Sequence, residues 1–574
     1  MLRSLLPVSL LFSIASGITT NATLANNVTQ FLQTVVKAMG GSDALNNLTS
    51  YSYEALTIYR SQTLTQSYAL NRSDQSVSAA GSQTMSFEER NATLLERIDR
   101  AYSYSDYWIW ALPTLTPDFN YSLVVHDGPN GFACFNRGQN SFYADDHTAA
   151  LGFADQYLTD YLIQQAHQFA LPWFIKQLMT ASPQSLSVHG IQDPLSGITL
   201  QAIDHPGLNL TLIINENLPY MVRSYEQHRI FGNSTSDVIF SNYSSFGSLL
   251  LPRRIQTVYN NFNMIEDIFL DNILTNPARL TGFFDADSTN TTSMPPAQSA
   301  EYPKSEVHEF FEAGLWGGPF PYNVSDLVIE YPIPSIPAIK SVWIGYADYV
   351  QFLIEFEDGF LVTDAPPHRS RIILEWVSQN SDKKITHVVP SHHHHDHAGG
   401  VDDYVAAGAS LVVPEIAKRY YAKVNGGHVN FTTYTQSQPF ILSDGKVQFR
   451  SFWHEDAPHA ADWTFAMVTA ACPTNDTAVA LFVADVVDPG DSSLFGEGYE
   501  TANAVRWDAG YARQWILEAM GLGVPRSATL VGAHGSTVVR NVSNAAVFEE
   551  VVGVTGVLYP DVGAESLAMG EGCQ

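Results

Sequence analysis

Residues 391–400 read SHHHHDHAGG and place five histidines and one aspartate in six consecutive positions. Imidazole nitrogens and carboxylate oxygens are ligands that zinc and other transition metals accept. Four adjacent histidines alone would be weak evidence for a metal site. The run, however, directly follows KITHVVP, an apolar segment typical of a buried strand. The pattern therefore predicts a metal site at the end of a strand.

The spacing within this run predicts which side chains act together. In an extended chain, residues two apart project to the same side, so His392 and His394 could hold one ion while the histidines after each of them point elsewhere. The chain then turns at DHAGG, where Asp396 and His397 could face a second ion. The spacing H-x-H-x-D-H, followed by two glycines, is more specific than a plain histidine run.

Further ligands are expected from distant segments, each next to a strand. His459 lies in APHAADWTFAM just before a strand, Asp485 ends AVALFVAD, and His534 ends ATLVGAH. Asp364 likewise ends GFLVTD. A carboxylate at the end of an apolar strand is costly unless it is paired or binds metal, so Asp485 fits a metal-bridging role. His454 is an alternative candidate for the ligand position of His459. We prefer His459, because an apolar strand follows it.

Together these segments resemble the metallo-β-lactamase superfamily over residues 325–560. The resemblance implies an α/β fold, a four-layer αβ/βα sandwich, with two metal ions that are most often zinc. Position 485 is aspartate where lactamases with a single cysteine ligand have cysteine, which disfavours a penicillinase. The matching segments are LVTDAP (361–366), SHHHHDHAGG (391–400), PHAAD (458–462), VADVV (483–487) and LVGAHG (530–535).

The resemblance also implies a role for each residue. Two ions would share a hydroxide that attacks an ester, lactone or similar bond, and the aspartate of the histidine run would orient it and move the proton to the leaving group. Zinc is the expected metal, with manganese and iron as alternatives. The implied first-ion ligands are His392, His394 and His459; those of the second are Asp396, His397 and His534; Asp485 bridges them, and Asp364 orients the loop from outside.

Two other functions remain open at this point. One is a redox enzyme, either a mononuclear iron oxygenase of the persulfide type or a flavin-partnered protein. The other is a non-catalytic lipid- or metal-binding protein with a degenerate site. Because none of the seven implied ligands is missing, the sequence favours a metal-dependent hydrolase.

Composition and charge restrict the partners. The chain has 574 residues, 45% of them hydrophobic and 15% charged, which is typical of a globular protein with more than one domain. Its formal net charge is −29, and such a surface repels phosphate backbones. We therefore expect a small-molecule substrate and no nucleic acid.

The N-terminus predicts export. Residues 1–17 combine one arginine, an apolar run and small residues at cleavage spacing, as in a secretory signal peptide. No later apolar stretch is long enough for stable membrane insertion. Three cysteines allow at most one disulfide. A secreted, extracellular glycoprotein is also indicated by the N-x-S/T asparagines Asn21, Asn27, Asn47, Asn71, Asn91, Asn120, Asn209, Asn233, Asn242, Asn290, Asn323, Asn430, Asn475 and Asn541.

The rest of the chain divides into domains by its rhythm. Residues 18–285 alternate apolar and polar residues between turns, which predicts a β-rich domain with a curved antiparallel sheet and helices. This domain faintly resembles the half-barrels of lipoprotein carriers of the LolA/LolB type, which would imply an amphiphilic substrate. Polar, proline-bearing residues 286–320 predict a linker, residues 321–560 the catalytic domain, and residues 561–574 a C-terminal tail.

Overall fold

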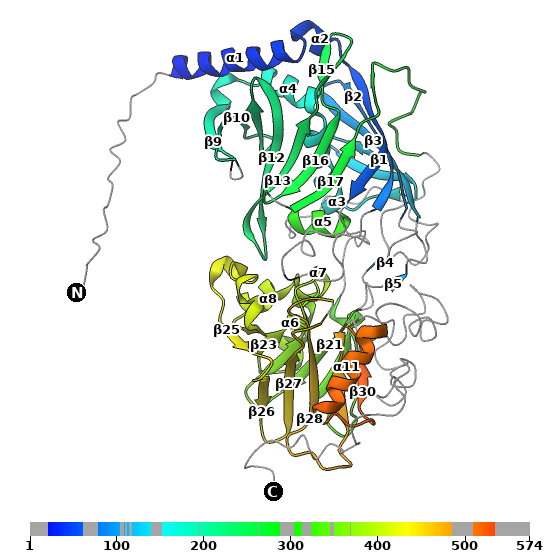
Figure 1. Cartoon of the computed structure of the whole chain (residues 1–574), viewed down its shortest axis with the longest axis vertical. Helices are drawn as coiled ribbons and strands as arrows, with labels where there is room; N and C mark the ends of the chain where they lie inside the picture. Colours follow the sequence, from blue (N-terminus) through cyan, green and yellow to red (C-terminus); the bar gives the residue numbers. More distant parts are fainter. Residues whose placement is uncertain are drawn as a thin grey trace, which may run out of the picture.

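The computed structural model has two stacked bodies, a curved sheet with helices above and an α/β sandwich below (Figure 1). The predicted signal peptide and C-terminal tail lie outside the described residues. No helix within the described part of the chain is long and apolar enough to cross a membrane. The structure describes residues 21–60, 70, 79–103, 108–109, 112–113, 118–138, 152–193, 196–261, 263–287, 304–312, 323–344, 349–367, 369–457, 459–484 and 509–533.

The N-terminal body is built on one 14-stranded sheet whose neighbouring strands are antiparallel, as predicted. The strand order is β8-β7-β6-β3-β2-β1-β17-β16-β13-β12-β11-β10-β9, and β18 also pairs with β1. The strands are β1 (Ser50–Arg60), β2 (Ala79–Arg90), β3 (Thr93–Ser103), β6 (Asp118–His126), β7 (Phe132–Arg137), β8 (Gly152–Phe153), β9 (Ser187–Gln192), β10 (Thr199–His205), β11 (Leu210–Asn215), β12 (Leu218–His228), β13 (Gly232–Ser241), β16 (Arg254–Tyr259), β17 (Asn263–Phe269) and β18 (Asn272–Thr275). Two small ribbons are β4 (Trp108–Ile109) with β5 (Leu112–Pro113), and β14 (Ser244–Phe246) with β15 (Leu249–Leu251).

Helices fill the curved sheet. The apolar spacing of residues 28–39 predicts a helix, which is present and ends before a glycine pair. A Cβ on the first of these, Gly40, would lie 2.2 Å from the Ser248 carbonyl oxygen. The apolar periodicity of residues 145–179 predicts one long helix, but residues 156–180 form two helices, which are broken next to Pro172 because proline has no N–H to continue a helical ladder. The helices are α1 (Asn21–Ala38), α2 (Ser42–Asn46), α3 (Gln156–Phe169), α4 (Leu171–Thr180) and the 3-10 turn η2 (Pro183–Ser185).

Part of the predicted linker, residues 286–320, is also helical. Helix α5 (Lys304–Glu312) buries Val307 and Phe311 in the N-terminal core. The hydroxyl of its Ser305 donates to the carbonyl of Gln227 at 3.1 Å. Residues 304–312, which the sequence places in the predicted linker, therefore pack with the N-terminal body; helix periodicity over nine residues is a weak signal beside prolines.

A polar cluster lies inside this apolar core. Glu96 and Arg100 share one face of β3 and are 1% and 4% exposed. The Arg100 guanidinium donates to the Gln83 side chain at 2.5 Å and pairs with Glu266 at 3.3 Å. Burial raises the pKa of Glu96 to about 8, although the positive charge of Arg100 opposes the shift. The Glu96 carboxyl is therefore largely protonated at neutral pH.

The C-terminal body has two facing sheets, which confirms the predicted α/β class. Ring centroids of Phe352 from one sheet and Phe482 from the other lie 5.4 Å apart in the core between them. One sheet has the order β19 (Val328–Glu330), β20 (Ile339–Trp343), β21 (Val350–Glu355), β22 (Phe360–Thr363), β23 (Ile385–Val389), β24 (Ser410–Pro414), β25 (Phe431–Tyr434). The other has the order β26 (Phe440–Ser443), β27 (Val447–Trp453), β28 (Thr464–Ala470), β29 (Val479–Phe482), β30 (Thr529–Val531).

Helices cover the outer faces, giving the layer order helix, sheet, sheet, helix (Figure 1). Ile373 of α6 and Val405 of α8 pack against the seven-stranded sheet, and Trp515 of α11 contacts Phe465 of β28. The apolar spacing of residues 415–424 predicts a helix, but the structure has short 3-10 turns at 415–419 and 424–427. The elements are α6 (Ser370–Asn380), α7 (His395–Ala398), α8 (Val401–Ala406), α11 (Ala509–Gly521), η3 (Val324–Asp326), η5 (Glu415–Arg419) and η6 (Val424–Gly427).

Candidate metal centre

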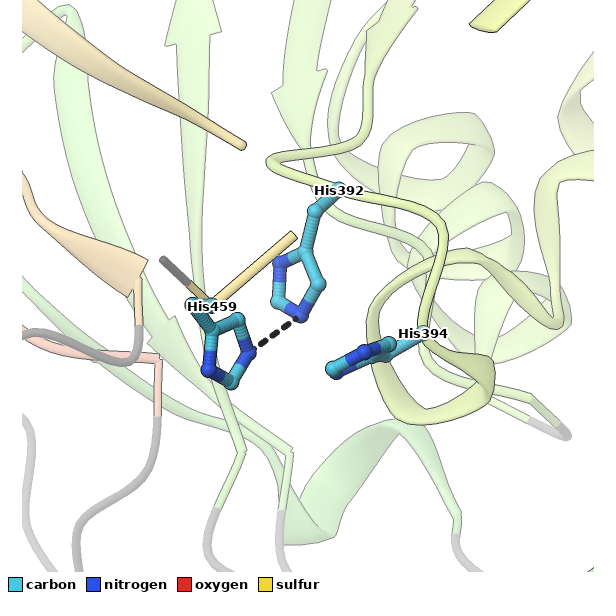
Figure 2. Close-up of side chains that lie close together, drawn as sticks. All are labelled: His392, His394 and His459. Carbon is cyan, nitrogen blue, oxygen red and sulfur yellow. Dashed lines mark hydrogen bonds between the residues drawn. The ribbon is translucent and has the colours of Figure 1, made fainter. Parts of the chain in front are cut away.

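Three histidines from two distant segments converge in the C-terminal body. His392 and His394 follow β23, and His459 lies in the loop between β27 and β28 (Figure 2). One ring nitrogen from each lies within 4.8 Å of the others, and all three side chains are buried. Strand β23 ends at Val389, and residues 391–394 are bends rather than strand. The two-residue spacing still pairs His392 with His394, although the strand has already ended.

The donor geometry of this triad fits a zinc-sized cation. The Nε2 atoms of His392 and His459 are 3.1 Å apart and point toward one another (Figure 2). Two imidazole ligands at about 2.0–2.1 Å from a tetrahedral zinc ion have nitrogens about 3.3 Å apart. All three ligand atoms are imidazole nitrogens, which suit zinc and similar transition metals.

The other histidines of the run have separate contacts. His393 turns away from the triad, and its Nδ1 lies 2.8 Å from the buried carboxylate of Asp462. His395 packs over the backbone of Gly399. His454, the alternative to His459, pairs with Glu518 and is not part of the described metal-type cluster. The Asp462–His393 contact was not predicted from the sequence, because the two residues are 69 positions apart.

Asp364 holds the loop that carries the ligands. It directly follows β22 in the left-handed region, with φ +54°, which aspartate and asparagine adopt more readily than other residues with a side chain. One carboxylate oxygen accepts the backbone N–H of Ser391 at 2.6 Å, and the other lies 2.8 Å from Nδ1 of His397. Because β22 and β23 are parallel neighbours, their ends meet at one edge of the sheet and make both contacts possible.

The remaining predicted ligands are partly within the described residues. Asp396 and His397 belong to α7, and Oδ2 of Asp396 lies 3.4 Å from Nε2 of His397. Asp485 and His534 lie outside the described residues, so the structure does not place them. Ala484 and Ala533 precede them in the sequence and lie just beyond the parallel strands β29 and β30. The N–H of Ala533 donates to the carbonyl of Ala484 at 3.1 Å.

Aromatic and hydroxyl groups support the loop from behind. The hydroxyl of Tyr420 donates to the carbonyl of His393 at 3.2 Å, and that of Tyr421 to the carbonyl of His392 at 3.5 Å. Burial, with the charges of nearby aspartates, raises the pKa of Tyr421, so this phenol keeps its proton and acts as a donor. The N–H and hydroxyl of Thr464 both donate to the carbonyl of Ser391, at 2.7 and 3.0 Å.

The two glycines after the ligands allow close packing of the loop. A Cβ on Gly400 would lie 2.1 Å from Oγ of Ser370 and 2.7 Å from the carbonyl oxygen of Pro366. The N–H of Gly400 donates to the carbonyl of Ala365, the residue after Asp364. We call residues 391–400 the metal loop. Only a residue without a side chain at position 400 lets the segment after β22 approach this loop so closely.

Replacing Asp364 by asparagine is expected to lower the affinity for zinc by about 10- to 100-fold, as for other groups that orient metal ligands. Asparagine tolerates the left-handed backbone of this position, so the variant tests the lost charge rather than strain. Competition with a chelator measures the affinity. Asp358→Asn, an exposed aspartate in the same hairpin, is the control, and equal affinities in the two variants would contradict the orienting role.

Comparisons with known proteins support one family for this domain. Residues 349–447 match the model described as "Metallo-beta-lactamase superfamily", a segment that includes the histidine run. None of the curated proteins matches the chain. A solved metallo-beta-lactamase from Pontibacter korlensis is 16% identical and covers 40% of this chain and 98% of its own, with a TM-score of 0.30. A metallo-beta-lactamase from Cronobacter sakazakii is 16% identical and covers 38% of this chain and 88% of its own, with a TM-score of 0.26.

The family match includes His392 and His394, two of the three residues of the buried triad. The N-terminal body, rich in antiparallel strands, has no named match. The C-terminal part of the chain is thus a metallo-beta-lactamase superfamily domain with a buried histidine triad, consistent with a metal-dependent hydrolase.

Proposed function

We propose that this protein is a secreted di-metal hydrolase, with zinc as the metal, that cleaves an ester, lactone or similar bond. The observation that carries the proposal is the convergence of His392, His394 and His459, all buried, within a domain of a hydrolase superfamily. A second ion is supported by the approach of Asp396 to His397 at 3.4 Å, beside the triad. Ring centroids of His392 and His397 are 4.2 Å apart, which makes the two ligand groups adjacent.

Each of the proposed site residues would have a specific role in metal binding or hydrolysis. The triad would hold one ion, and Asp396 and His397, with His534 and the bridging Asp485, the other. When bound, zinc lowers the pKa of a coordinated water and polarises a carbonyl oxygen. The Asp396 carboxylate would orient the attacking water and carry its proton toward the leaving group.

Metal analysis of the purified protein, followed by a panel of esters and lactones, tests this proposal. About two zinc ions per chain and hydrolysis that a chelator stops would support it. One iron ion per chain with thiol-dependent oxygen consumption would favour the oxygenase alternative instead. A protein that takes up no metal from added zinc would contradict catalysis and favour a non-catalytic binding role.

Export is the second part of the proposal. Cys472 is in a disulfide, which is typical of oxidising compartments, and Cys134 is buried. Glycans require surface asparagines, and every N-x-S/T asparagine whose side chain the structure describes is exposed. These are Asn47, Asn91, Asn120, Asn209, Asn233, Asn242, Asn323, Asn430 and Asn475.

Protein secreted from a eukaryotic host is therefore expected to lose mass on treatment with an enzyme that removes N-linked glycans. Protein made in a bacterial cytoplasm, which lacks this modification, serves as the control and should keep its mass. Secreted protein with the same mass before and after treatment would contradict the glycoprotein assignment.

An amphiphilic substrate, brought by the N-terminal body, remains a prediction that rests on its resemblance to lipoprotein carriers. Helices α1, α3 and α4 pack their apolar side chains into the core of this body. Acyl esters of different chain lengths belong in the substrate panel, because a preference for long chains would support the carrier resemblance.

A further inference from the structure

The turn between β12 and β13 of the N-terminal body reaches the catalytic domain. We call residues 228–232 the hairpin tip. Ile230 and Phe231 are 1% and 8% exposed and belong to a core cluster that otherwise consists mainly of catalytic-domain residues, including Tyr421 and Val424. The tip is therefore buried between the two bodies rather than being a free loop.

The tip has a fixed shape of its own. Nδ1 of His228 accepts the backbone N–H groups of Ile230 and Phe231, at 3.0 and 3.2 Å. The His228 ring also stacks on that of Phe231, with centroids 4.4 Å apart. Because a ring nitrogen satisfies two backbone donors inside the turn, Phe231 is presented to the other domain in one orientation.

Two contacts of the tip lead directly to the metal loop. The ring of Phe231 packs edge-on against that of Tyr420, with centroids 5.4 Å apart and planes at 90°. The Tyr420 hydroxyl donates to the carbonyl of His393, which stands between the ligands His392 and His394. Phe231 is thus one side chain removed from the backbone that sets the positions of both ligands.

An ion pair and a backbone hydrogen bond join the same two bodies. Arg229 pairs with Asp403 of α8 at 2.9 Å, and both side chains are mostly buried. Helix α8 begins directly after the two glycines of the metal loop. On the other side, the carbonyl of Leu70 accepts the N–H of Ala461 at 2.6 Å, two residues after His459. N-terminal residues therefore contact helix α8, which follows the loop with His392 and His394, and the segment that carries His459.

We propose that the hairpin tip positions the metal centre, with Phe231 acting through Tyr420 on the backbone of His393. The inference rests on the metal site of the proposed function and adds that the N-terminal body is a working part of that site. Packing of an aromatic pair and a hydrogen bond to the ligand-bearing backbone limit the movement of His392 and His394. Loosening the tip should alter how the ligands hold a metal, without removing any ligand.

The test uses the full-length protein loaded with Co²⁺, whose visible absorption reports ligand geometry. Phe231→Ala is expected to shift the cobalt bands and to speed metal loss to a chelator by about tenfold, the lower end for residues that act on ligands indirectly. Tyr420→Phe, which keeps the ring and removes only the hydroxyl, should change both readouts in the same direction. Phe135→Ala is the matched control, because Phe135 is also a phenylalanine with 8% exposure but lies in the N-terminal core.

The outcomes separate this inference from the proposed function. If Phe231→Ala and Tyr420→Phe both match the unmodified protein, or if Phe135→Ala shifts the spectrum equally, the positioning role is wrong while the metal site stands. If Phe231→Ala does not fold, Tyr420→Phe alone decides between the two results. If the unmodified protein binds no Co²⁺, the metal site itself is wrong.

Discussion

Replacing His394 by alanine is expected to remove bound metal and to lower hydrolytic activity by more than about a hundredfold. His394 supplies one of only three ring nitrogens in the described cluster, and even residues that merely orient metal ligands cost about 10- to 100-fold when they are changed. Plasma mass spectrometry gives the metal content per chain. Rates are measured on whichever ester or lactone the unmodified protein hydrolyses.

His428→Ala is the control for this experiment, because it removes an exposed histidine of the same domain. It should keep both the metal and the activity. His392→Ala and His459→Ala should resemble His394→Ala, since the three rings converge on one point. A His394→Ala protein with full metal content and an unchanged rate would mean that the triad is not the site.

The second large effect concerns stability and pH. As pH rises from about 4.5 to about 8, the free energy of unfolding of Glu96→Gln is expected to exceed that of the unmodified protein by a growing amount. The pKa of Glu96 is raised to about 8 in the folded state by burial, from an ordinary value of 4.5. The folded chain therefore holds a proton that the unfolded chain releases in this window, so the stability of the unmodified protein falls as pH rises through it.

Glutamine is neutral at every pH and removes this loss. At about 1.4 kcal/mol for each pKa unit, the shift from 4.5 to about 8 gives the variant a gain on the order of 5 kcal/mol between pH 4 and pH 9. Thermal unfolding at several pH values measures it as a difference in midpoint that grows with pH. Glu216→Gln, at an exposed turn, should show no such trend. A pH-independent difference for Glu96→Gln would show that the carboxyl is not protonated in the fold.

Local patterns predicted the elements that carry the site. The apolar runs became β22, β23, β28, β29 and β30, and Asp364 became a neighbour of Ser391 and His397 because β22 and β23 are parallel. The choice of His459 over His454 followed from the strand that begins five residues later, and the described cluster contains His459. Two-residue spacing brought His392 and His394 together even beyond the strand.

Contacts between distant segments could not be predicted in this way. Asp462 stands in a quoted motif, but nothing local indicates that it faces His393 across 69 residues. The approach of Phe231 to Tyr420 depends on how two bodies pack, which no periodicity encodes. For such pairs, the sequence supplies the residue types while the partner is decided by the tertiary fold.

Two other misses have local explanations. Pro172 lies inside the helical pattern of residues 145–179 and divides it, as proline does in helix interiors. Glu96 and Arg100 occupy every second position with Leu94 and Ile98, so strand alternation alone puts them on the buried face. A charged pair on an apolar strand face was therefore a readable signal of a buried polar cluster.

The topology of the large sheet sets the order in which the protein can be assembled during synthesis. Strand β1 pairs with β17 and β18, so the large sheet of the N-terminal body is complete only when residue 275 has been made. At about 5 to 20 residues per second, His459 follows roughly 10 to 40 s later. Since domains form as units from the N-terminus, the hairpin tip already exists when the ligand segments emerge. The nascent catalytic domain therefore folds onto a finished template supplied by its own chain.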